Sequence, residues 1–219
     1  MPSLPNPVPM IAMIVAIGLI PFAALMVTCY TKLVIVFGLT RNALGIQQVP
    51  PNLVLNGIAL ILTLFIMAPV GGDMVNNLKG RNFNSGAQFS VDDVMAIVDA
   101  GVPPIKAFLQ KHTQERERNF FLKSATNIWP SGRAQNLQAD DLTVLVPSFT
   151  LTELTKAFQI GFVVYIVFVI VDLLVANVLL ALGMQMISPT TISVPFKLLL
   201  FVMLDGWAVL IHGLVLSYH

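Results

Sequence analysis

The chain has 219 residues, of which 56% are hydrophobic and 11% are charged, and its mean hydropathy is +0.82. Soluble domains carry about 25% charged residues, so this composition argues against an ordinary water-soluble domain. The formal net charge of +1 leaves no strongly basic surface for nucleic acid, and the single cysteine, Cys29, excludes an internal disulfide.

Four apolar stretches mark the chain, at residues 10–39, 53–70, 160–182 and 194–216. Each reaches or nearly reaches the roughly 18 to 20 residues that a helix needs to cross about 30 Å of hydrocarbon. We therefore expect an all-α integral membrane protein with four hydrophobic segments.

The charges are concentrated between the second and third of these stretches. Residues 71–143 contain eight of the twelve basic and eight of the eleven acidic residues. This distribution predicts a first hydrophobic hairpin over residues 1–70, a small helical polar domain over 71–143, and a second hydrophobic hairpin over 144–219. Lys32 and Arg41 favour a cytoplasmic connection at the first hairpin, which would turn the polar domain toward the periplasm.

Within the polar domain the sequence predicts two helices. Ser90, with Asp93 three residues later, is typical of a helix start. Pro103 and Pro104 predict the start of the second helix, and Trp129 with its following proline predicts its end.

Catalytic and metal-binding patterns are missing from the sequence. The three histidines, His112, His212 and His219, are far apart and lack metal-ligand spacing. Neither a phosphate-binding G-x-x-x-x-G-K-[ST] loop nor a G-x-S-x-G nucleophile turn occurs. We expect no enzymatic activity, no cofactor and no metal.

Outside the polar domain only seven charged residues remain, and ions in apolar helices normally find partners because burying them alone is costly. Asp172 lies midway along the third stretch, and either a structural ion pair or a role in a solute or proton relay would explain it. Pairing with Lys197, Lys156 or Lys32 is the interpretation we favour. Glu153 and Lys156 are three residues apart, so they share a helical face. The complete set consists of Lys32, Arg41, Glu153, Lys156, Asp172, Lys197 and Asp205.

Helix-breaking residues occur within the apolar stretches or shortly after them. Such residues are tolerated at membrane depth where protein or water satisfies the freed backbone groups. They fit either ordinary kinks or helices folded as hairpins around a conduit. They are Gly18, Pro21, Gly38, Gly57, Pro69, Gly183, Pro189, Pro195 and Gly206.

Met184, Gln185 and Met186 lie just after the third stretch. Methionine side chains are unbranched and deformable, so several of them from neighbouring copies could close a pore and still yield to a passing polypeptide. The alternative is a chance cluster, since the chain contains ten methionines.

Five sequence blocks resemble one known family, and they cover both hydrophobic halves in order. They are residues 41–52 (RNALGIQQVPPN, with Gln47, Gln48, Pro50, Pro51 and Asn52), 65–69 (FIMAP), 153–162 (ELTKAFQIGF), 194–201 (VPFKLLLF) and 205–207 (DGW). The chain thereby resembles the export-gate subunit of type III secretion systems, called SctR or YscR in injectisomes and FliP in flagella. Its length is more similar to the injectisome branch.

This resemblance implies a ring of five copies in the bacterial inner membrane, joined by SctS-like and SctT-like subunits and other needle-base proteins. The ring would line and gate the channel for unfolded secreted substrates. The apolar segments would be bent hairpins lifted partly out of the bilayer. Met184 and Met186 fall where the family has a methionine-rich constriction, which Gln185 interrupts here, and the buried charges would serve contacts within and between subunits. The alternative is a small-solute or proton-coupled transporter that uses Asp172.

Overall fold

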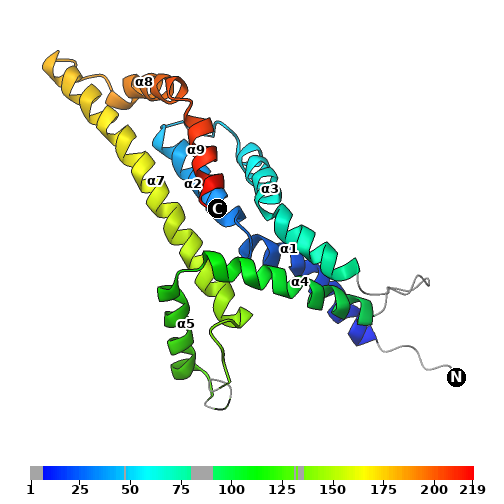
Figure 1. The fold of residues 1–219 in the computed structure, drawn as a ribbon. Helices are drawn as coiled ribbons and strands as arrows, with labels where there is room; N and C mark the ends of the chain where they lie inside the picture. The colour runs from blue at the N-terminus through cyan, green and yellow to red at the C-terminus, as the bar shows by residue number, and fades with distance from the viewer. Residues whose placement is uncertain (1–6, 47, 80–90, 131, 133–135) are drawn as a thin grey trace.

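The structure is a computed structural model that describes residues 7–46, 48–79, 91–130, 132 and 136–219, and this part of the chain is all-helical without strands (Figure 1). This confirms the predicted all-α class. The helices are α1 (Pro7–Met26), α2 (Tyr30–Ala43), α3 (Asn52–Lys79), α4 (Val91–His112), α5 (Glu115–Ile128), α7 (Leu142–Ala181), α8 (Pro189–Met203) and α9 (Gly206–Leu216).

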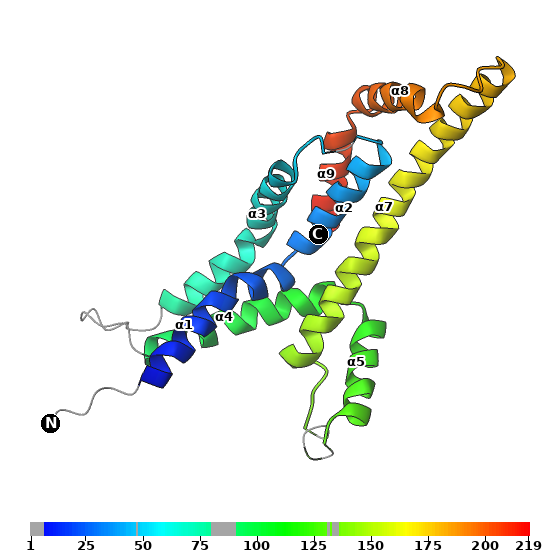
Figure 2. The same ribbon diagram turned by 180° about the vertical axis from the view of Figure 1, so that it is seen from behind.

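The long helix α7 runs along one side of the molecule (Figures 1 and 2). Helix α2 packs against α7 and α3, while α4 and α5 both contact the first part of α7. At the other end α8 crosses the helices and turns into α9. The close approach of α2 and α7 depends on Gly161, because a Cβ atom there would overlap the side chain of Leu39.

The main hydrophobic core lies where α2, α3, α4 and α7 meet. Leu33 and Phe37 from α2 pack there with Phe108 from α4 and with Leu145 and Phe149 from α7. Much apolar surface remains outside this core, for instance at Phe65 of α3 and at Phe162 and Leu174 of α7. Such a surface needs lipid or other protein chains around it.

Two helices among the described residues are long and apolar enough to cross a membrane, α3 and α7. Helices α8 and α9 together would make a third span, although they meet at a bend of 59°. The expected number of four spans is therefore not reached in this part of the chain. The first apolar stretch is divided between α1 and α2 by a break after Met26.

Only some of the helix-breaking residues named above lie where a helix ends. Pro21, Pro69 and Pro195 lie inside helices, whereas Gly183, Pro189 and Gly206 lie at helix ends. A proline fixes φ near the helical value, so a long helix can continue through it when the freed carbonyl finds another environment.

In the polar domain, too, a helix continues through prolines. Helix α4 continues through Pro103 and Pro104, so the expected helix start at Pro103 is wrong, and the second helix begins instead at Glu115. The expected end of that helix near Trp129 is confirmed, since Trp129 is its C-terminal cap.

Candidate functional site

Three of the seven scarce ions, two of them buried, meet at the centre of the molecule. The Nζ atom of Lys32 on α2 lies 3.2 Å from Oε2 of Glu153 on α7, and each side chain is only 1% exposed. Lys156, one helical turn after Glu153, lies 3.6 Å from the other carboxylate oxygen, Oε1. We call Lys32, Glu153, Lys156 and Tyr218 the central cluster.

Tyr218, two residues beyond α9, completes the central cluster. Its hydroxyl donates a hydrogen bond to Oε2 of Glu153, and the Lys32 ammonium lies 3.6 Å from the centre of its ring. Lys32 also donates a hydrogen bond of 2.9 Å to the hydroxyl of Ser217. Buried ions are stable only when their charge and hydrogen-bonding capacity are satisfied, so these contacts fix α2, α7 and the segment after α9 to one another.

The polar domain attaches to α7 beside this cluster. Lys156 donates a hydrogen bond of 3.2 Å to the backbone carbonyl of His112, the last residue of α4. Two residues later, the backbone N–H of Gln114 donates to the hydroxyl of Thr152 on α7 at 3.2 Å. Burial of the His112 ring lowers its pKa to about 4, so the imidazole is neutral at pH 7.

A second charged group holds α8 in place. Lys197 of α8 donates a hydrogen bond of 2.5 Å to Asp172 of α7 and another of 3.3 Å to the carbonyl of Ala43, the last residue of α2. The hydroxyl of Ser193 donates to the second oxygen of Asp172 at 2.6 Å. A cation suits the end of α2 because the last carbonyls of a helix lack partners within it. We call Asp172, Ser193, Lys197 and the Ala43 carbonyl the α8 clamp.

Arg41 organises the connection between α2 and α3. Its guanidinium donates to the carbonyl of Pro50 at 3.1 Å and to the side chain of Asn52, the first residue of α3, at 2.6 Å. Pro51 directly precedes α3, and Gln48 is exposed with a positive φ of 66°. Gln47, the remaining residue of this motif, lies outside the described residues.

Asp205 differs from the other ions of the set. It is exposed, makes no ion pair with any residue that the structure describes, and has a φ of 48° at the bend between α8 and α9. Gly206 follows it, and a Cβ atom there would overlap the ring of Phe201. These two residues therefore shape the bend instead of balancing a buried charge.

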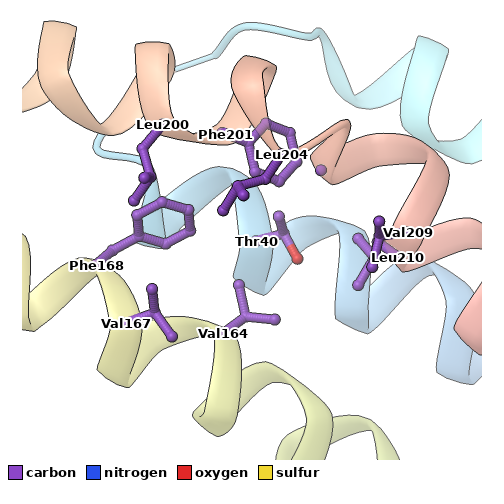
Figure 3. A pocket seen from close by; sticks show the side chains of 10 residues that line it. Thr40, Val164, Val167, Phe168, Leu200, Phe201, Leu204, Val209 and Leu210 are labelled. Carbon is purple, nitrogen blue, oxygen red and sulfur yellow. The ribbon is translucent and has the colours of Figure 1, made fainter.

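An apolar cavity of about 260 Å³ lies inside this bend, between α2, α7, α8 and α9. Figure 3 shows Phe168 of α7 and Leu204 beyond α8 facing it from opposite sides, with Thr40 of α2 behind them. The Thr40 hydroxyl already donates to the carbonyl of Val36 at 2.9 Å. The lining thus suits hydrocarbon and offers little to a polar ligand.

The methionine residues lie on the loop that joins α7 and α8, at one tip of the molecule (Figure 1). Gly183, with a φ of 70°, ends α7 in a Schellman motif, in which the N–H of Met184 bonds to the carbonyl of Leu179 at 2.9 Å. Met184 is 41% exposed and Met186 fully exposed, with Gln185 exposed between them. The loop is therefore available to neighbouring chains.

The sequence did not indicate three residues that belong to these sites: His112 as a buried residue, Ser193 and Tyr218. Each acts through a contact between distant parts of the chain, which no local spacing reveals. No group of three or more His, Cys, Asp or Glu residues suited to a metal occurs among the residues for which the structure gives a placement.

Comparison with known proteins assigns the family. Residues 13–214 match the model described as the FliP family. The chain is 54% identical to the hypersensitivity response secretion protein HrcR of Ralstonia nicotianae, over 95% of this chain and 96% of the relative. It is 54% identical to a pathogenicity-related protein of Xanthomonas campestris pv. glycines, over 95% of each chain.

The Yop proteins translocation protein R of Yersinia pestis is 45% identical over 99% of this chain and 98% of its own. Proteins of this group are components of a secretion apparatus and do not form an enzyme family. The chain belongs to the FliP family, as an SctR-type type III secretion component of the injectisome kind.

Proposed function

We propose that the chain is a core pore-forming subunit of a type III export apparatus, which lines and gates the channel for unfolded proteins across the bacterial inner membrane. Its relatives are named as secretion and translocation proteins, and its helices α3 and α7 are able to span a membrane. The observation that carries the proposal is the exposed methionine loop at the tip of α7, held outside the protomer's own core.

Assembly with sister chains follows from the distribution of apolar surface. The central cluster and the α8 clamp pair five of the seven scarce ions within one chain. Large hydrophobic side chains on α3 and α7, such as Phe65 and Phe162, remain exposed. We infer a ring of five copies joined by SctS-like and SctT-like subunits, in which the internal ion pairs fix each protomer's shape and the apolar faces make the contacts between subunits.

Gating would then follow from the softness of the methionine side chains. In a ring, Met184 and Met186 of all copies face a common axis and close it by dispersion contacts. A polypeptide pushed into this seal displaces the flexible thioethers without breaking any strong bond. Gln185 adds a polar group, which gives the seal a more hydrated character than methionine alone.

The test is the ion conductance of the reconstituted complex with Met184→Ala and Met186→Ala combined. We expect normal assembly on native gels and a leak of small ions at least several-fold above that of the unmodified complex. Met203→Ala is the matched control, because Met203 is also exposed but lies at the other end of α8. Unchanged conductance in the double variant, or an equal leak in the control, would contradict a seal at this loop.

A further inference from the structure

His112 differs from the other two histidines by its surroundings. It is 9% exposed, whereas His212 and His219 are exposed. Its ring centre lies 4.7 Å from that of Phe108 and 5.1 Å from that of Tyr218. Two aromatic rings cannot replace the water that a charged imidazole needs, so this site holds the neutral form.

The charges around this ring also disfavour a proton. From α2 it faces Lys32, from α7 Lys156 and Glu153, and from its own helix Lys111. Glu153 is the only anion in this set and is already shared by Lys32, Lys156 and the Tyr218 hydroxyl. Helix α3 contacts α4 near Ala100, which is about three helical turns from His112, so this contact is remote from the imidazole. An imidazolium would therefore add one more cation to a buried group with a surplus of positive charge.

His112 is also where the polar domain is fastened. Its carbonyl accepts the hydrogen bond from Lys156, and Gln114 binds Thr152 immediately after it. Helix α5 begins at the next residue, Glu115, and packs against α7. A movement of His112 away from Tyr218 would thus loosen the end of α4 and the start of α5 together.

We propose that this attachment is a proton-sensitive joint, in which neutral His112 holds α4 and α5 against α7 and a proton on its imidazole releases them. Histidine in water has a pKa of about 6.5, whereas the buried ring has a pKa of about 4. The attached state is therefore fully favoured above about pH 6.5 and loses its advantage as the pH falls toward 4. The ratio of released to attached molecules should rise about 30-fold between pH 7.5 and pH 5. The joint does not depend on the proposed channel.

The joint can be tested with two spin labels on the full chain in lipid nanodiscs, one at Lys123→Cys on α5 and one at Thr155→Cys on α7. Both positions are exposed, and the native Cys29 is buried. Distance distributions between the two labels are measured by double electron–electron resonance from pH 7.5 to pH 4.5. We expect one narrow distance at pH 7.5 and a second, longer population that grows as the pH falls.

Three variants assign any transition to His112. His112→Gln should abolish it, and His212→Gln should retain it. Lys111→Gln removes a cation that faces the imidazole, so it should move the transition to higher pH. An unchanged distance in the unmodified protein, or a transition that persists in His112→Gln, overturns the proposal. If His112→Gln does not fold, Lys111→Gln decides, since an unshifted transition there also overturns it.

Discussion

The central cluster and the α8 clamp solve the same problem in different surroundings. In the central cluster a carboxylate and a lysine that are each 1% exposed meet one further lysine and a phenol, and three segments of the chain converge there: α2, α7 and the residues after α9. In the α8 clamp the carboxylate of Asp172 is 35% exposed. It accepts hydrogen bonds from Lys197 and from Ser193, and Lys197 also donates to the backbone carbonyl of Ala43.

This difference in exposure determines how well the central cluster and the α8 clamp each tolerate the substitution of one of their residues. Asp172 lies partly at the surface of the protomer, so its carboxylate can turn toward other polar groups when a partner is lost. No water reaches the Lys32–Glu153 pair, so a lost partner there leaves an uncompensated charge in a low-dielectric interior. We therefore expect the central cluster to determine whether the protomer folds and the α8 clamp to determine how firmly α8 is held.

The largest effect is expected for Glu153→Leu. It leaves Lys32 buried without its carboxylate, which should lower the free energy of unfolding by about 3–5 kcal/mol. Thermal unfolding in detergent measures this loss. The double variant Lys32→Met/Glu153→Leu should recover much of it, because it also removes the stranded cation. A loss below about 1 kcal/mol in the single variant would contradict the ranking of the two sites.

Asp172→Asn should have an intermediate effect. The amide oxygen can still accept one hydrogen bond, and the partial exposure of the site reduces the electrostatic loss, so we expect about 1–3 kcal/mol and weaker assembly. Asp73→Asn, the same substitution at an exposed position of α3, serves as the control. Normal assembly and export in Asp172→Asn, with loss of proton coupling alone, would favour the transporter alternative over an ion pair that holds α8.

The smallest effect is expected for Tyr218→Phe. This change removes the hydroxyl that donates to Glu153 but keeps the ring that stacks with Phe108 and contacts Lys32. The unfolding free energy should fall by about 1–2 kcal/mol. Tyr165→Phe, on the exposed face of α7, should change it by less than about 0.5 kcal/mol. Equal effects of the two substitutions would mean that the hydroxyl of Tyr218 adds nothing to the cluster.

The sequence predicted those structural features that depend on composition or on the spacing of residues close together in the chain. The all-helical class, the apolar stretches and the shared face of Glu153 and Lys156 all follow from patterns within a few turns of helix. The contact of Lys32 with Glu153 joins residues far apart in the chain, and no periodicity encodes it. Tyr218 gave no signal for the same reason.

The helix breaks were harder to predict because proline has two opposite effects. It removes a backbone donor, yet its fixed φ is compatible with a helix, and tertiary packing decides which effect dominates at Pro69 or Pro195. The bend between α8 and α9 instead uses the left-handed backbone conformation of Asp205. Aspartate tolerates this conformation, but its presence in a sequence does not predict it.

Helix α7 contains 40 residues without interruption, a length of about 60 Å. The methionine loop is at one end of this rod, and the contacts with α4 and α5 are near the other. A rigid strut carries displacement over its whole length, so a push that tilts the tip must also tilt the far end or break its attachments there. The two ends of the protomer are therefore mechanically connected, although no side chain bridges them.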